Sequence, residues 1–206
     1  MKNNVYYAIE LFSPEYNPYE VTFEEWTARW WQWLLSIPKT ESPLFDDPDG
    51  KKCSKNQSGP VWYLPGTLGG SAERSCTVPS GKAILLPVLN VECSFAEGDG
   101  TTEEQLRSNV MTEMDKITRI EVSINDQKID LAENRIQSIP FDAFLPKNNV
   151  LGVQDGTTRM VSDGYWLFLK APKRGRYNIH SFGSCLAGTI KIDLAYHLTI
   201  GKLINI

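Results

Sequence analysis

The sequence predicts a mainly β protein: an antiparallel β-sandwich of jelly-roll type with a Trp-rich helix near its N-terminus and one further helix near residues 101–116. Short apolar segments of strand length, separated by turn residues, fill the chain after residue 80. Strands do not alternate with long amphipathic helices, as a parallel α/β sheet would require. A length of 206 residues suits a single domain spanning residues 1–206.

The first element is an amphipathic helix over Phe23–Ile37. Thr22 and Glu25 have the spacing of a capping box, and Pro38 ends the helix. Trp31 falls beside the main apolar stripe, so we expect the helix to be buried on two sides or to present aromatic side chains to a partner. The stripe that should pack on the sheet consists of large side chains at helical spacing: Trp26, Trp30, Trp33 and Leu34.

The middle of the chain changes character twice. Residues 38–80 are rich in Pro, Gly, Ser and charged residues and predict loops, with one apolar island at Val61–Leu64. Gly81–Cys93 is an apolar run typical of a strand buried on both faces, and Pro87 indicates a bulge or a strand edge within it. A second helix should begin at Thr101, where the capping-box pattern recurs.

The last third of the chain, part of a β-rich region over residues 81–206, has the pattern of strands and turns. Residues 120–124 alternate apolar and polar side chains and lead to a turn at Asn125-Asp126. Strands follow at Gly164–Leu169 and Arg176–Phe182. Ile190–Ile200 alternates with period two over eleven residues, which predicts one buried and one solvated face.

Charge and hydropathy exclude several classes of partner. A net charge of -4 offers no reason to expect nucleic acid as a partner. No segment holds the ~20 consecutive apolar residues of a membrane helix. The first twenty residues do not resemble a secretion signal, which favours the cytoplasm unless a leader is removed from the chain. No motif predicts a cofactor.

Four cysteines and two histidines lack the paired spacing of a zinc site. Cys53 and Cys76 lie in turn-rich sequence on either side of one apolar segment, and a disulfide between them would close that loop. The alternative is that both, with Cys93 and Cys185, are reduced and mostly buried thiols.

Glu92 is the main candidate for catalysis. Asn90 and Glu92 have the strand parity of Val88, so both should lie at the end of a buried face, where burial raises the pKa of a carboxyl group. With Asp163 as a second carboxylate, Glu92 would form a glycosidase-like pair. The arrangement we expect instead is structural, with Glu92 bound to a cation such as Arg74.

Two weaker hypotheses concern the other polar residues. Cys93 with His180 or His197 has the residue types of a nucleophile and base, but no nucleophile motif surrounds Cys93 and His197 lies on the solvated face of the last strand. A solvated turn, or weak calcium ligation by oxygen, is indicated by three nearby acidic residues: Asp46, Asp47 and Asp49.

The aromatic content leads to the functional hypothesis. The chain has more aromatic residues than one helix-on-sheet contact needs, and flat rings suit sugar rings or other small molecules. We therefore expect a non-catalytic protein that binds a small molecule or glycan, or self-assembles, through an aromatic-lined surface. The alternatives are a hydrolase using Glu92 and Asp163, a homo-oligomer built on the Trp-rich helix, and plain core packing. The proposed binding residues are Trp31, Trp62, Tyr63, Asn90, Tyr165 and Trp166.

Four segments distributed over most of the chain resemble an uncharacterised family of microbial proteins: WTARWWQWLLSIPK, GPVWYLPGT, CTVPSGKAILLPVLNVEC and SDGYWLFL. The resemblance implies a shared β-rich fold and supplies no catalytic residue. Export of the relatives, which the resemblance also suggests, would favour the Cys53–Cys76 disulfide.

Overall fold

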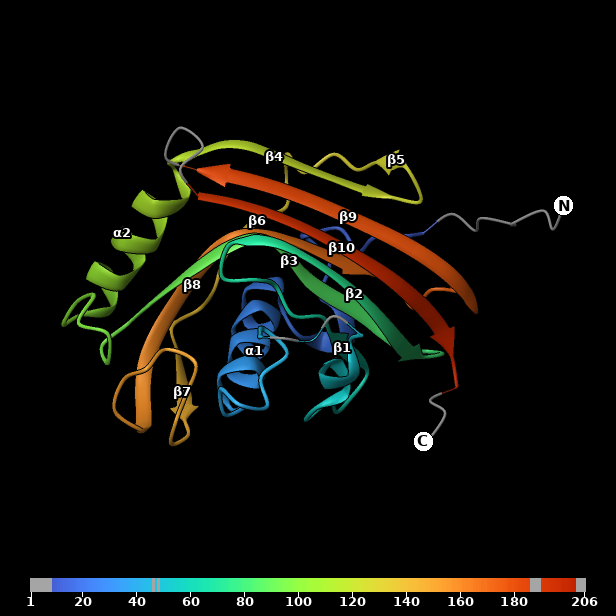
Figure 1. Cartoon of the computed structure of the whole chain (residues 1–206). Coiled ribbons are helices and arrows are strands. Elements are labelled where there is room, and N and C mark those ends of the chain that lie inside the picture. Colours follow the sequence, from blue (N-terminus) through green and yellow to red (C-terminus); the bar gives the residue numbers. More distant parts are fainter. Residues whose placement is uncertain (1–8, 46, 48, 186–189, 203–206) are drawn as a thin grey trace, which may run out of the picture.

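The computed structural model describes residues 9–45, 47, 49–185 and 190–202. Two five-stranded sheets lie one above the other, and helix α1 covers the remaining face of the lower sheet (Figure 1). Sheet A has the order β1-β3-β8-β6, with β7 also paired to β8: Val61–Tyr63, Ala83–Ser94, Gly156–Leu169, Arg135–Gln137 and Phe141–Leu145. Sheet B has the order β2-β10-β9-β4-β5: Gly70–Pro79, Ile190–Gly201, Gly175–Cys185, Ile117–Ile124 and Gln127–Lys128.

Both sheets are mixed, so the antiparallel jelly-roll expectation is not confirmed beyond its mainly β character. β1 runs parallel to β3, and β2 runs parallel to β10. The chain leaves sheet A after β1, passes through sheet B as β2 and returns to sheet A as β3. This crossover is what lets two strands so close in sequence lie parallel.

Strand β2 also corrects the expectation of loops over residues 38–80. Its ten residues pair along their whole length with β10. Arg74, Cys76 and Val78 point inward at alternate positions, but the other side chains are small or polar. The apolar alternation is therefore too weak to indicate a strand.

The main core lies between the two sheets, and the last strand contributes to it as expected. Its inward side chains, at every second position, are buried: Ile192, Leu194, Tyr196, Leu198 and Ile200. Lys191 and His197 alternate with them and face solvent. The side chain of Ile190 lies outside the described residues. The turn at Asn125-Asp126 is confirmed, since both residues have positive φ and join β4 to β5.

Helix α1 (Phe23–Leu35) packs on the opposite face of sheet A, as predicted, but it ends at Leu35, two residues before the expected Ile37. The Thr22 side chain accepts a hydrogen bond from the Glu25 amide, which confirms the N-terminal cap. Trp26, Trp30, Trp33 and Leu34 are all buried in a second core with β3, β7 and β8. The same burial leaves no part of this stripe free for a partner, so the structure offers no support for an oligomer built on this helix.

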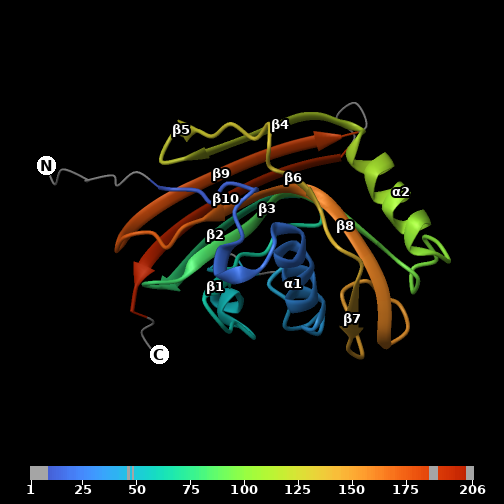
Figure 2. The ribbon, with the colours of Figure 1, turned by 180° about the vertical axis from the view of Figure 1, so that it is seen from behind.

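Helix α2 (Glu103–Met114) begins two residues after the expected position. Thr102 caps it by accepting a hydrogen bond from the Gln105 amide, while the Gln105 side chain accepts one from the Thr101 amide. Its Leu106 and Val110 pack on Cys93 and Val161, where β3 and β8 extend beyond sheet B (Figure 2). No described helix has the length and apolar character needed to cross a bilayer.

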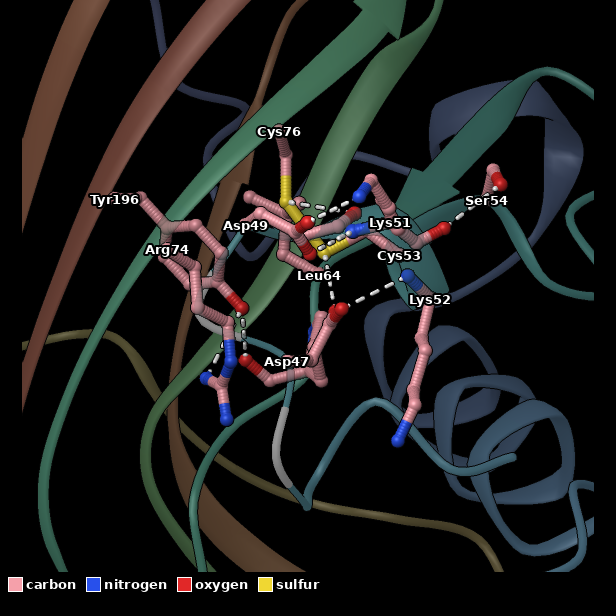
Figure 3. Close-up of a disulfide and its surroundings, with 12 residues drawn as sticks. Asp47, Asp49, Lys51, Lys52, Cys53, Ser54, Leu64, Arg74, Cys76 and Tyr196 are labelled. Carbon is pink, nitrogen blue, oxygen red and sulfur yellow. Dashed lines mark hydrogen bonds and ion pairs between the residues drawn. A yellow bond between two sulfur atoms is a disulfide. The ribbon is translucent and has the colours of Figure 1, made fainter. Parts of the chain in front are cut away.

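The predicted disulfide is present. Cys53, in the short helix η2 (Lys51–Ser54), is bonded to Cys76 of β2, with Cα atoms 6.5 Å apart (Figure 3). Gly50 caps η2 with φ of 65°, and a Cβ there would lie 2.2 Å from the Ser75 carbonyl oxygen. Only glycine fits this close approach. Cys93 and Cys185 are free thiols.

Candidate functional site

The candidate site begins where β1 ends. β1 pairs only with Ala83–Leu85, and the Leu64 amide makes the last hydrogen bond, to the Leu85 carbonyl. Beyond this point, no strand among the described residues pairs with that edge of β3. The second half of β3 therefore has one edge bonded to β8 and one free edge.

Two buried side chains of sheet B hold the following loop away from β3. The Tyr196 hydroxyl donates a hydrogen bond to the Pro65 carbonyl at 2.5 Å, and the Arg74 guanidinium donates one to the Gly66 carbonyl at 2.9 Å. Arg74 and Tyr196 lie side by side near the disulfide (Figure 3). The chain is thus drawn toward sheet B, and a space opens beside the free edge.

That space is a pocket of about 270 Å³. We call it the β3-edge pocket. Helix α1, the loop of residues 66–69 and the C-terminal end of α2 form its walls, and Leu89–Glu92 of β3 run along it. The lining residues include three of α1, two of β3 and one of α2: Trp30, Trp31, Leu34, Asn90, Glu92 and Glu113.

A bulge at Val88 determines which side chains face α1. Pro87 pairs with Trp166 and Leu89 with Tyr165, so Val88 is an extra residue in β3. Leu89 continues on the side of sheet B, since a Cβ at Gly183 of β9 would lie 3.0 Å from it.

Asn90 and Glu92 consequently lie on the α1 face, and the expectation that they share the face of Val88 is wrong. Pro87 correctly predicts the bulge, but the bulge itself inverts the parity of every later residue in β3.

Three residues that line the pocket each carry a polar atom without a hydrogen-bond partner among the described residues. These atoms are the Trp31 Nε1, the Asn90 Nδ2 and the Glu92 Oε2, each shielded from solvent. The other three indoles of α1 are satisfied, because Trp26, Trp30 and Trp33 donate to backbone carbonyls at 2.8 to 2.9 Å. Trp62 Nε1, Ser162 Oγ and Trp166 Nε1 also lack a partner among the described residues, but these residues do not line the pocket.

Glu92 is not the cation-bound anchor that the sequence suggests. Arg74 binds the Gly66 carbonyl instead, and no described cation forms an ion pair with Glu92. Burial raises its pKa well above the usual value, and the charge of Glu97, a hydrogen bond to it and the charge of Asp99 raise it further. Glu92 is thus a buried carboxyl group that favours its neutral form.

The alternative hypothesis, a catalytic pair of Glu92 and Asp163, is wrong. Asp163 pairs with Val91 across the strands, so it projects from the other face of sheet A. It is buried and forms an ion pair with Arg135 at 2.8 Å. The carboxyl group whose charge raises the pKa of Glu92 most is Glu97, which the sequence pattern does not identify.

Of the six proposed binding residues, only Trp31 and Asn90 meet in the pocket. Trp62 lies in the core between the sheets, while Tyr63 and Trp166 lie in the core beneath α1. Tyr165 packs against the core between the sheets and is half-buried. These side chains do not form a continuous aromatic surface, because most of them fill the two cores.

The carboxylates of the acidic turn bind groups of the protein itself. The Asp47 carboxylate accepts a hydrogen bond from the Lys52 amide, and Asp49 forms an ion pair with Lys51. Asp46 lies outside the described residues. Within the described part of the chain, no group of three or more His, Cys, Asp or Glu side chains is arranged to hold a metal ion.

Cys93 and the histidines do not meet either. Burial and, next in size, the charge of Asp99 together raise the pKa of Cys93 to about 12, so the nucleophilic thiolate is disfavoured. His180 and His197 are on the outer face of sheet B, paired with Asp193 and Glu73 respectively. The structure therefore does not place Cys93 next to either histidine, as a nucleophile–base pair would require.

Comparison with known proteins adds no function. No family model matches the chain, and no curated protein matches it. Among solved structures, it is similar to a chain in the structure of PbICP-C in complex with falcipain-2, with 12% identity and a TM-score of 0.29. That similarity covers 69% of this chain and 99% of the other. A likeness at this score supports no conclusion about fold or activity.

Proposed function

We propose that the chain is a non-catalytic protein that binds a small molecule in the β3-edge pocket. The observation that carries the proposal is a pocket lined by three residues, Trp31, Asn90 and Glu92, that each carry a shielded polar atom without a partner among the described residues. Leaving a buried polar group unsatisfied costs about 1–3 kcal/mol. A ligand that bonds to these atoms would recover that free energy.

The pocket walls define the ligand that fits. Trp31 and Asn90 each supply an N–H donor, so the ligand needs a hydrogen-bond acceptor. Leu68, Val91 and Ile117, which are partly or fully exposed, supply apolar surface suited to a ring. The volume is at the lower end of the ~300–1,000 Å³ of ligand pockets, which favours a molecule about the size of a single ring, including a monosaccharide.

A ligand-observed NMR screen with a library of ring-sized compounds, monosaccharides included, tests this proposal. Trp31→Phe keeps an aromatic ring but removes the N–H, and Asn90→Leu removes the amide at similar volume. Trp33→Phe is the matched control, because Trp33 donates to the Lys55 carbonyl and does not line the pocket.

We expect the hits to weaken in Trp31→Phe and Asn90→Leu and to persist in Trp33→Phe. A screen without hits would contradict small-molecule binding at this pocket, as would hits whose affinity is the same in both pocket variants and the wild type. Water would then be the partner of these polar atoms.

Acid catalysis is the second candidate function, and the raised pKa of Glu92 favours it. A neutral carboxyl group in a pocket is suited to donate a proton to a leaving group, and Glu97 would be its carboxylate partner. Glu92→Gln should then abolish hydrolysis of a substrate that the variant still binds. Hydrolysis that survives in Glu92→Gln would exclude this role.

A further inference from the structure

The charges around the β3-edge pocket are almost all negative. Glu92 and Glu113 line it, and no Lys, Arg or His does so among the described residues. Glu113 is neutralised by an ion pair with Lys116. Glu97 and Asp99 act on Glu92 from the loop after β3, and neither forms an ion pair with a described cation. The carboxyl groups next to the pocket are thus more numerous than the cationic groups that pair with them.

The indoles provide a second, independent feature. Trp30 and Trp31 both line the pocket, with ring centroids 5.0 Å apart in an edge-to-face arrangement. Trp31 is only 8% exposed, yet its N–H has no partner among the described residues. Indole faces attract cations more strongly than other aromatic rings do. The Trp31 indole, together with an acid that has no cationic partner among the described residues, has the chemistry of a site for an organic cation.

We infer that the ligand of the β3-edge pocket is a small organic amine whose ammonium group pairs with Glu92. This inference rests on the proposed small-molecule binding and specifies its ligand class. A carboxylate or phosphate ligand would place a further negative charge beside Glu92, Glu97 and Asp99, which is unfavourable at low dielectric. An acceptor atom on the same ligand would take the hydrogens of Trp31 and Asn90.

Binding of the amine should release a proton. Without a cation, the carboxyl group of Glu92 holds its proton above the usual pH range because it is buried near Glu97. An ammonium group beside it stabilises the carboxylate, so Glu92 loses its proton to solvent while the amine keeps its own. The other titratable groups facing this site are Asp99, Glu113 and Cys185, from the loop after β3, from α2 and from β9.

Three probes of one shape separate the ligand classes: benzylamine, benzyl alcohol and benzoate. We expect titration near neutral pH to show benzylamine bound roughly tenfold or more tightly than the other two. Benzylamine affinity should rise between about pH 5 and about pH 8, because Glu92 ionises more readily as the pH increases.

Matched variants assign the effect to Glu92. Glu92→Gln should reduce benzylamine affinity to the level of benzyl alcohol and leave benzyl alcohol unchanged. Glu121→Gln is the control, because Glu121 lies on the surface of sheet B and pairs with Arg119. Thermal unfolding of both variants verifies that they are folded.

The outcomes separate this inference from the proposed function. If benzyl alcohol or benzoate binds as tightly as benzylamine and Trp31→Phe weakens them, the cation inference is overturned and small-molecule binding stands. Benzylamine binding that is unaffected by Glu92→Gln also overturns it. If none of the three probes binds, the cation inference fails, and the NMR screen alone decides the proposed function.

Discussion

The two halves of β3 have opposite surroundings. In the packed half, Ala83–Val88, one edge of the strand is bonded to β8 and the other edge is bonded to β1 over Ala83–Leu85. Sheet B covers one face of this half and α1 covers the other. In the pocket half, Leu89–Ser94, the edge that faced β1 is free and the Val88 bulge turns Asn90 and Glu92 toward α1. One strand thus serves both as core and as the rim of a pocket.

The difference teaches where this protein tolerates unsatisfied polar groups. Near the packed half, the Trp30 N–H donates to the Leu64 carbonyl, while the buried N–H groups of Trp62 and Trp166 have no partner among the described residues. One residue beyond Trp30 along α1, the Trp31 N–H has no partner among the described residues either. Folded proteins commonly depart from local rules of satisfaction at functional sites. What distinguishes the pocket half is that its unsatisfied groups belong to residues lining a cavity, which supports the proposed binding there.

The largest effect should come from breaking the packed half. Trp30 is 1% exposed and contacts Trp166 and Trp33 edge to face. Trp30→Ala should lower the free energy of unfolding by about 3–5 kcal/mol, measured by urea denaturation. Tyr16→Ala, at a residue 60% exposed, should change it by less than about 0.5 kcal/mol. A loss under about 1 kcal/mol for Trp30→Ala would contradict the assignment of Trp30 to the core.

The disulfide should rank next. Cys53 and Cys76 are 23 residues apart in the chain, so replacing both by serine should cost about 3 kcal/mol in oxidised protein. Cys185→Ser, which leaves the bond intact, is the control. Thiol titration of unfolded, unreduced wild-type protein should find two free thiols. Four free thiols would show that the bond does not form.

Gly164→Ala should disturb the pocket half directly. A Cβ at Gly164 would lie 2.4 Å from the Asn90 Cβ and 2.7 Å from the Leu89 carbonyl oxygen. Relief requires β3 and β8 to separate, which we expect to cost about 1–3 kcal/mol and to weaken probe binding. Ser162→Ala, two residues away on β8, adds no atom and serves as the control. Unchanged stability and binding in Gly164→Ala would mean that the strands do not approach this closely.

Elements specified by local sequence are those that could be predicted. Helix α1 follows from Thr22, Glu25 and a stripe of large apolar residues, and β10 follows from strict alternation over residues 190–200. In both cases a single segment contains the whole signal. The Cys53–Cys76 bond was one of two open alternatives, because nothing local to either cysteine identifies its partner.

The rest depends on contacts that no segment encodes alone. Strand β2 becomes recognisable only through its pairing with β10. Pro87 indicates a bulge, but which face Asn90 and Glu92 adopt depends on the number of residues the bulge inserts. The pocket needs β1 to end where Tyr196 and Arg74 can hold the following loop. The sequence therefore indicates which residue types are candidates for the site, but it does not predict how they are arranged in space.

The last prediction concerns the pH dependence of stability, where Glu92 should act against the fold. In the unfolded chain its pKa is near the ordinary 4.5, and in the folded chain burial and Glu97 raise it. Between these two values the folded state binds more protons than the unfolded state, so stability falls as the pH rises through that window. Above the folded pKa the full loss is present.

Glu92→Gln removes this titration and keeps the shape of the side chain. The variant should be more stable than the wild type at about pH 8, and the difference should shrink as the pH falls to about 4. Glu113→Gln, which loses an ion pair with Lys116, should give no such gain. Denaturant unfolding at both pH values measures the effect. If the wild type is more stable than Glu92→Gln at about pH 8, a cation in the folded protein must neutralise the charge of Glu92, and the prediction is wrong. Adding benzylamine should narrow the stability difference between Glu92→Gln and the wild type at about pH 8, because the ligand stabilises the folded wild type more than the variant that binds it less tightly.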